Sequence, residues 1–318
     1  MMQRQYWIDW CKVFGIYLVV LGHFSYGIGS LYLWFYTFHM PLFFIISGYL
    51  CSSKQRSISE ELIHNTKTLF LPYLALVTIG WFLERAVCVL SKNEYEGSFI
   101  LSLIGLPCGK VNPMWFVYCL FAVKFIDVTI SYICKIFRKI TPPVLIVLFI
   151  SLSISNEIIH LPKPISRFFV AIPYYWAGKF LKNKSGLLFM SCSCCRLLAV
   201  ILGLLIPIIS VIINGPVDMY YCCFGSNGLL YFIFGIISSY VILNVFKNYF
   251  NKESKIFTNL SKGTIMIVAF HRFLLWPLET YNNILIIRLL IPLIVVVFFY
   301  YPIRFTMCYA PYILGNRR

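Results

Sequence analysis

Charged residues are scarce in this sequence. Only 12% of its 318 residues are Asp, Glu, Lys or Arg, whereas 60% are hydrophobic, and the mean hydropathy is +0.82. A water-soluble domain of this length could not cover its surface with so few charges. Because apolar runs long enough to cross a bilayer recur along the chain, the sequence predicts a polytopic membrane protein.

Acidic residues are the scarcer kind of charge: 11 Asp and Glu stand against 27 Lys and Arg, which gives a net charge of +16. Such an excess also occurs in proteins that bind nucleic acid. Here, however, the basic residues form short clusters between apolar runs, as the positive-inside rule describes, and no single basic stripe. We therefore expect no nucleic-acid partner, and the side on which the clusters fall predicts that both termini are cytoplasmic.

Three further absences narrow the fold. No small-residue cleavage site follows the first apolar run, which predicts a true first span and no cleavable signal peptide. The tract Cys192, Cys194 and Cys195 has no second Cys or His pair at ligand spacing, so no metal site is predicted. We see no soluble segment, low-complexity linker or internal repeat, and we expect residues 1–318 to form a single membrane-embedded domain.

The apolar runs themselves predict an all-α protein with about ten transmembrane helices. Their approximate bounds are 9–29, 31–50, 69–90, 113–134, 143–156, 165–181, 197–213, 228–246, 262–279 and 284–305.

The first predicted span carries an acid, a base and a histidine on one side. At roughly 100° per residue, Lys12 and His23 lie almost above one another, and Asp9 lies within about 40° of His23. Ionisable groups inside a membrane are costly and usually face a cavity or a partner. His23 is therefore a candidate general base or nucleophile, although it could also simply bond a neighbouring helix. Lys12, which could pair with Asp9, either snorkels to the interface or presents a cation to a phosphate-bearing donor.

The second predicted span contains His39 and Pro41 in the run FHMPLFF. Proline frees a backbone carbonyl and favours a kink. His39 could help to polarise a substrate, or it could bond the backbone at that kink. Gly48, near the inner end, allows close approach of another helix.

The ninth predicted span contains His271 and Arg272 in MIVAFHRFLLW. A cation beside a titratable group could bind an anionic or polar substrate, and a buried pairing role is the alternative. Two other pairs inside spans, Glu84–Arg85 and Lys124–Asp127, are interpreted as mainly structural.

Taken together, these stretches resemble a known family. DWCKVFGIYLVVLGH is similar to the first-helix signature of the membrane-bound acyltransferase-3 family, and FHMPLFFIISGYL resembles its second-helix signature, especially in the fucose 4-O-acetylase-like and surface-polysaccharide O-acetyltransferase branch. Looser similarity continues through KTLFLPYL, NPMWFVYCLF, YYWAGKFLKN and LSKGTIMIVAFHRFLLWPL, in family order along essentially the whole chain.

The resemblance implies a ten-span acyltransferase in a bacterial inner membrane, with acetyl-CoA as a co-substrate, no permanently bound cofactor, and a sugar hydroxyl as acceptor. It implies that His23 is the essential histidine, Lys12 its basic partner and Asp9 the preceding acid. His39 and His271 match histidines that some branches have. Many members have Arg in place of Lys12, and Lys cannot make the bidentate phosphate contacts of a guanidinium. The C-terminal soluble domain of some relatives is not expected here.

We therefore expect an enzyme that transfers an acyl group, with acetyl favoured, from cytoplasmic acyl-CoA to a cell-surface or lipid-linked carbohydrate. Asp9 and His23 are its predicted catalytic residues, and Lys12, His39, His271 and Arg272 its predicted substrate-binding residues. A polysaccharide exporter or lipid-linked sugar flippase is the alternative, because buried charges would serve it equally well. An acyltransferase must consume acyl-CoA, whereas a transporter moves its substrate unmodified.

Overall fold

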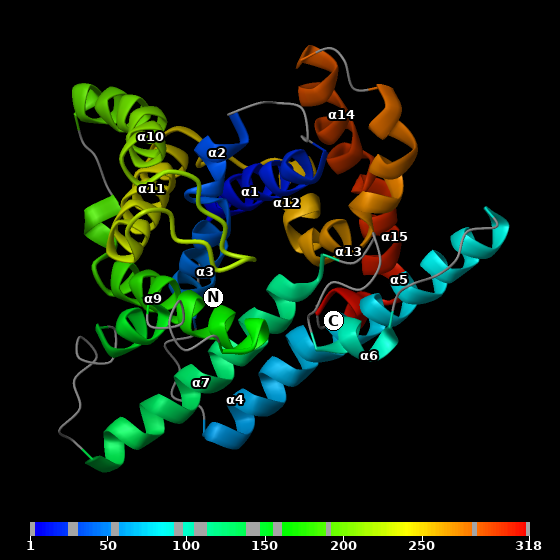
Figure 1. Cartoon of the computed structure of the whole chain (residues 1–318), viewed down its shortest axis with the longest axis horizontal. Helices are drawn as coiled ribbons and strands as arrows, with labels where there is room; N and C mark the ends of the chain where they lie inside the picture. The colour runs from blue at the N-terminus through cyan, green and yellow to red at the C-terminus, as the bar shows by residue number, and fades with distance from the viewer. Residues whose placement is uncertain are drawn as a thin grey trace. The chain divides into compact units, whose positions relative to one another are not determined.

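The described part of the chain is helical almost throughout. The computed structural model describes residues 4–24, 31–51, 57–91, 98–104, 113–137, 147–154, 161–188, 192–281 and 285–315. Within these ranges the β structure consists of one isolated bridge between Asp218 and Cys223. The prediction of an all-α polytopic membrane protein is confirmed (Figure 1).

The labelled elements, in chain order, are α1 (Tyr6–Phe24), α2 (Leu31–Tyr36), α3 (His39–Tyr49), α4 (Ile58–Asn65), η1 (Thr66–Phe70), α5 (Leu71–Leu90), α6 (Phe99–Leu103), α7 (Trp115–Phe137), α9 (Lys163–Asn183), η2 (Ser185–Leu188), α10 (Ser193–Asn214), α11 (Gly228–Tyr249), α12 (Lys255–Lys262), α13 (Thr264–Leu275), η3 (Trp276–Tyr281), α14 (Leu285–Phe298), α15 (Tyr300–Tyr309) and η4 (Pro311–Leu314). η1 is a π-helical turn, and the other three η elements are 3₁₀ turns.

The expected number of spans, about ten, differs from what the structure shows. Among the described residues, seven helical stretches are long and apolar enough to cross a membrane. They are Tyr6–Phe24, Leu31–Tyr49, Ile58–Leu90, Trp115–Ile133, Ser193–Asn214, Gly228–Tyr249 and Leu285–Tyr309.

Each of the other three predicted spans differs from these seven stretches for a reason of its own. The span at 165–181 became α9, which is 21 residues long but carries four basic residues. The span at 262–279 is divided, so that its apolar helix α13 has only 12 residues, short of the ~20 that a bilayer requires. Of the span at 143–156, residues 147–154 are helical and the rest lies outside the described residues.

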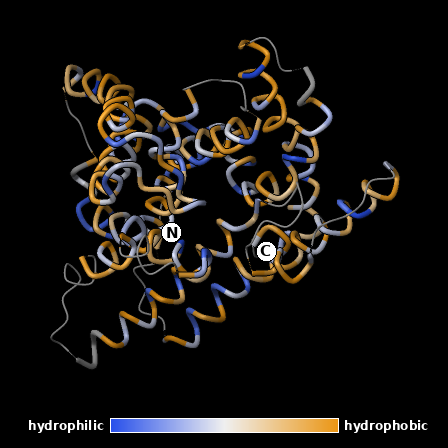
Figure 2. The backbone as a smooth tube through the Cα atoms, in the orientation of Figure 1, coloured by the Kyte–Doolittle hydropathy of each residue, from blue (hydrophilic) through white to orange (hydrophobic). Residues whose placement is uncertain are grey.

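Apolar side chains cover long parts of the helix surfaces. Figure 2 shows hydrophobic residues along most of α10, α11 and α14. On α10, for example, Ile212 is 77% exposed and Leu197 is 57% exposed. Large apolar side chains exposed on this scale suit a hydrocarbon environment, in which every helical backbone group is bonded within its own helix.

The chain divides into two compact units. Unit 1 comprises Met1–Gly15, Gly29–Gln55 and Ile126–Ser254, and unit 2 comprises Ile16–Ile28, Arg56–Phe125 and Lys255–Arg318. The division passes through α1 and α7, so that each of these helices contributes its two ends to different units.

Unit 1 contains a close crossing of α3 and α9. A methyl group added at Gly48 would overlap the Tyr175 carbonyl, and one added at Gly178 would overlap the Ile45 carbonyl. The two backbones therefore touch at two reciprocal points, which only glycine permits. The approach predicted for Gly48 is confirmed.

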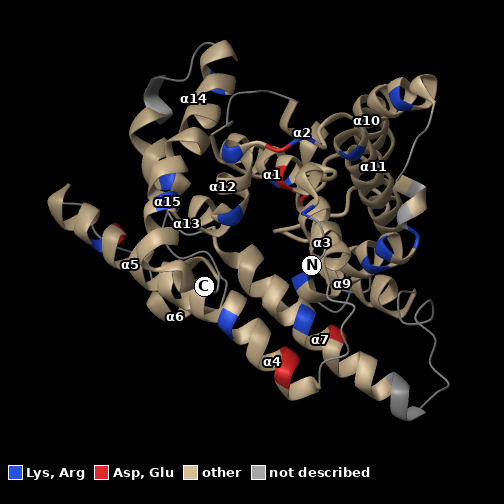
Figure 3. Ribbon diagram, turned by 180° about the vertical axis from the view of Figure 1, so that it is seen from behind, with Lys and Arg blue, Asp and Glu red and all other residues tan. Residues whose placement is uncertain are grey.

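Charged side chains in unit 1 also join helices. On α7, Asp127 is buried and accepts hydrogen bonds from Lys179 Nζ, at 2.8 and 2.9 Å, and from Trp176 Nε1, at 2.8 Å. Figure 3 shows how few acidic residues there are among the basic ones. A buried carboxylate needs hydrogen-bond donors, and both donors to Asp127 of α7 come from α9. These bonds therefore hold α7 against α9.

Unit 2 holds the second half of α1 beside α14. The Tyr17 hydroxyl donates to the Leu289 carbonyl at 3.2 Å, and α13 packs against both α14 and α5. Near the α5–α13 crossing, a methyl group at Gly80 would lie 3.9 Å from the Phe270 ring. This packing brings the C-terminal turn of α1 to α13.

Candidate active site

The structure brings two of the predicted site residues together. His23 lies in the last turn of α1 and is half-buried, and His271 lies on α13 and is fully buried. Their rings are in contact inside unit 2, with centroids 5.0 Å apart and planes inclined by 44°. The sequence predicted each residue separately, and their pairing is a result of the fold.

The hydrogen bonds of His271 assign its tautomer. Nδ1 lies 2.8 Å from the Ile267 carbonyl oxygen and 3.1 Å from that of Val268. A carbonyl oxygen can only accept, so Nδ1 must carry the hydrogen, and in a neutral ring Nε2 then carries the lone pair. Nε2 is buried and makes no hydrogen bond with any residue of the described chain.

Arg272 follows His271 directly and is half-buried. Successive residues of a helix point about 100° apart, so Arg272 faces different neighbours from His271. The structure therefore places the two predicted substrate-binding residues next to each other in sequence but on different sides of α13.

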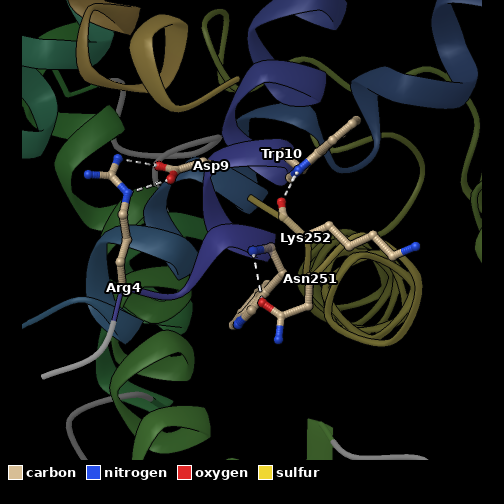
Figure 4. A network of polar contacts seen from close by, with 6 residues as sticks. Arg4, Asp9, Trp10, Asn251 and Lys252 are labelled. Carbon is tan, nitrogen blue, oxygen red and sulfur yellow. Dashed lines mark hydrogen bonds and ion pairs between the residues drawn. The ribbon is translucent and has the colours of Figure 1, made fainter. Parts of the chain in front are cut away.

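At the other end of α1, in unit 1, Asp9 has a partner that the sequence analysis did not consider. Arg4 donates from Nε to Asp9 Oδ2 at 2.8 Å and from its second terminal nitrogen to Oδ1 at 3.1 Å. Figure 4 shows this bidentate pair. The hydrogen bond to Asp9 raises the pKa of the Arg4 guanidinium above its ordinary value. Arg4 lies outside the apolar pattern, which is why helical periodicity did not find it.

The same end of α1 is tied to the segment that follows α11. The Trp10 indole N–H donates to the Lys252 carbonyl at 2.9 Å, and the Trp7 backbone N–H donates to Asn251 Oδ1 at 3.4 Å (Figure 4). These contacts and the ion pair fix the start of α1 within unit 1. Along the helix, Asp9 and His23 are 14 positions apart, about 21 Å at ~1.5 Å per residue.

His39 begins α3 and is 8% exposed. Its Nδ1–H donates to the Phe35 carbonyl at 2.9 Å, and its ring lies 4.8 Å from the Tyr36 ring. The helix is interrupted between the end of α2 and the start of α3, just before Pro41, so the predicted kink is present. One ring nitrogen of His39 thus bonds the backbone at the break, as one of its two predicted roles requires, and its role in substrate binding stays a prediction.

A buried arginine in α9 was missed from the sequence. Arg167 is 2% exposed, its Nε donates to the Tyr220 carbonyl at 2.8 Å, and its guanidinium carbon lies 3.9 Å from the centre of the Tyr220 ring. The loop between α10 and α11 contributes Tyr220, and Asp218 in that loop accepts from two backbone N–H groups. Burial raises the pKa of Asp218 above its ordinary value. The sequence contains no periodic signal for such a contact between a helix and a loop.

Comparison with known proteins gives two matches. A family model described as "Acyltransferase domain" matches residues 5–313. Nodulation protein NolL of Mesorhizobium japonicum is 29% identical over 130 residues, which cover 37% of this chain and 33% of that protein. The match therefore spans about a third of the length of this curated relative. No solved structure matches the chain.

Proposed function

The chain belongs to the acyltransferase-3 family, and from this premise we propose that it transfers an acyl group, with acetyl as the expected one, from cytoplasmic acyl-CoA to a hydroxyl group of a cell-surface or lipid-linked carbohydrate. The long apolar helices of the described chain are those of a multi-pass membrane protein. We place it in the bacterial inner membrane, where cytoplasmic acyl-CoA is available on one side and an outer carbohydrate on the other.

The observation that carries this proposal is the contact between His23 and His271 within an apolar unit. Acyl transfer from a thioester to a hydroxyl needs a base for the hydroxyl proton or a nucleophile that holds the acyl group in transit. A half-buried imidazole can take either role, because part of it is accessible while its ring contacts that of His271. His23 is therefore the residue to which we assign the chemistry.

The proposed reaction breaks the thioester C–S bond and forms an ester C–O bond. With His23 as base, the hydroxyl oxygen attacks the acyl carbon, its proton moves to the imidazole, and the departing CoA thiolate recovers that proton. With His23 as carrier, the imidazole nitrogen first displaces the thiolate. The hydroxyl then displaces the imidazole, and its proton passes to the CoA thiolate. Both routes require His23 to be neutral at the start.

The position of His23 along α1 agrees with an acceptor outside the cell. His23 is 17 residues beyond Tyr6, roughly 25 Å along the helix. With the predicted cytoplasmic N-terminus, such a length would put His23 in the outer part of a hydrocarbon core that is ~30 Å thick, which supports the proposal.

We propose that the other predicted residues serve the substrates. Lys12 lies 11 positions before His23, about 16 Å along α1, and its cation would attract the phosphates of acyl-CoA on the cytoplasmic side. Asp9, paired with Arg4, sets the electrostatics and the placement of that end of the helix. Arg272 is proposed to bind the polar acceptor, and His39 is a separate proposed substrate-binding residue.

The experiment that tests the proposal follows both substrates at once. Membranes that contain the protein, and matched membranes without it, receive acetyl-CoA with a labelled acetyl group together with the surface glycan or its lipid-linked precursor. We expect protein-dependent release of free CoA thiol in step with label in the glycan. Export of unlabelled glycan that depends on the protein, with no consumption of acetyl-CoA, would replace the proposal with the transporter alternative. Succinyl-CoA in parallel tests the choice of acyl group.

A further inference from the structure

His271 is better suited to act on His23 than to bind a substrate. It is 0% exposed, and its Nδ1–H is held by the carbonyls of Ile267 and Val268. A group so enclosed is separated from an acceptor sugar by the residues around it. His23 is half-buried and remains accessible. The two imidazoles thus divide into an accessible one and an enclosed one.

The Nε2 lone pair of His271 is buried, where a hydrogen-bond acceptor without a donor destabilises the fold. A leucine or methionine at this position would avoid that cost. Among the described residues, Nε2 of His271 makes no hydrogen bond, yet its ring touches the His23 ring. Two imidazoles joined by an N–H···N bond have ring centres about 5 Å apart, from ring size and the bond lengths of ~2.9 Å that such bonds have. The observed separation is 5.0 Å, which matches the separation that such a bond requires.

We propose that His271 is a positioning residue, whose Nε2 lone pair accepts a hydrogen bond from the ring N–H of His23 during the reaction. This inference rests on the proposed function of His23. The bond presents the second nitrogen of His23 to the substrate as an acceptor or nucleophile. It also stabilises the ring when that nitrogen takes a proton or an acyl group and the ring becomes positively charged. No atom is transferred to His271, so the overall reaction is unchanged by its participation.

The logic is that of a base oriented by a third group. In serine hydrolases a buried acceptor fixes the tautomer of the reacting histidine, and here a neutral histidine takes the place of the usual carboxylate. The backbone carbonyls one turn before His271 explain how the ring that carries the Nε2 lone pair is held. The ring of His271 bonds backward within its own helix, so α13 itself fixes the tautomer and limits the rotation of the ring that contacts His23.

Two substitutions, each of which keeps a polar group at the position of one ring nitrogen, separate the positioning role of His271 from a structural one. In His271→Gln the terminal amide reaches the position of Nε2, and its oxygen can accept from His23. In His271→Asn the amide reaches only the position of Nδ1, so the bond to the Ile267 carbonyl is kept and the acceptor at the Nε2 position is lost. His64→Gln, on α4 in the same unit, is the control for a change of histidine elsewhere.

The measurement is the rate of CoA thiol release in membranes, with kcat and KM determined separately for acetyl-CoA and for the acceptor. We expect His271→Asn to lower kcat about 100-fold, as loss of a group that orients a reacting residue does, and to leave both KM values within about twofold. We expect the kcat of His271→Gln to be at least tenfold higher than that of His271→Asn, and the kcat of His64→Gln to match that of the wild type. Thermal unfolding in detergent verifies that the variants are folded.

Three results would overturn the proposal: wild-type kcat in His271→Asn, equal losses in the Gln and Asn variants at equal stability, or a raised KM for the acceptor with kcat unchanged. The last would return His271 to the substrate-binding role expected from the sequence. Failure of the proposed function itself is distinguishable, because the wild type would then release no CoA thiol at all.

Discussion

Replacing Gly48 with alanine is expected to destabilise unit 1. The new methyl group would overlap the carbonyl of Tyr175, which is a backbone atom and cannot rotate away. Ordinary contact between a methyl carbon and such an atom begins near 3.4 Å, so α3 and α9 must separate by roughly 1 Å or more. Overpacking of this kind costs about 1–3 kcal/mol.

The reciprocal contact makes the prediction sharper. Gly178 on α9 meets the Ile45 carbonyl of α3 in the same crossing, so Gly178→Ala should cost a similar amount. Once one methyl group has separated the helices, however, the second has space. We therefore expect the double variant to lose clearly less stability than the sum of the two single variants.

Thermal unfolding of the detergent-purified protein measures these effects, with Gly203→Ala in α10 as the matched control. At Gly203 a methyl group would lie 3.5 Å from Val241 Cγ1, and alanine favours a helix by up to about 1 kcal/mol. The control should therefore be neutral or more stable than the wild type. If Gly48→Ala unfolds at the same temperature as the control, or if the losses at Gly48 and Gly178 simply add, the close crossing is wrong.

Two further predictions concern buried polar groups. Asn65 is 1% exposed, and neither polar atom of its side-chain amide has a hydrogen-bond partner in the described chain. Replacing Asn65 with leucine should therefore raise the unfolding temperature in detergent. A lower unfolding temperature would show that the amide has a partner. Burial raises the pKa of Asp218 above 3.8, which means that the folded loop binds this proton more tightly than the unfolded chain does. Protection of the Tyr220 and Tyr221 amides from hydrogen exchange, corrected for intrinsic rates, should therefore fall as pH rises from about 4 through the raised pKa. Asp218→Asn should abolish this dependence and keep the two backbone bonds, whereas Asp218→Ala should lose the protection at every pH.

Features that depend on local pattern could be predicted from the sequence. The apolar run of α1 and the interruption before Pro41 are examples, although α1 begins at Tyr6, earlier than predicted. The predicted end of that span, at residues 25–29, lies outside the described residues. The close approach at Gly48 is another, because glycine near the end of an apolar run leaves space for a neighbouring backbone.

Features that depend on long-range contacts could not. His23 and His271 were each singled out because an ionisable residue inside an apolar run is unusual, but periodicity carries no information about which helices meet. Asp9 and Lys12 could be recognised as a possible pair because they are three positions apart, but the ion pair of Asp9 with Arg4, before the helix begins, was not foreseen. Arg167 meets a loop, and the sequence pattern of a loop does not say where it folds back.

The central claim, that His23 carries the acyl transfer, is tested most directly by one substitution. Membranes with equal amounts of wild-type protein, His23→Ala or His64→Ala receive acetyl-CoA with a labelled acetyl group, and label in the surface glycan is counted. We predict that label appears with the wild type and with His64→Ala and is reduced at least 100-fold with His23→Ala, because the reacting imidazole is gone. Equal labelling by His23→Ala and the wild type would contradict the account, whatever the family of the protein.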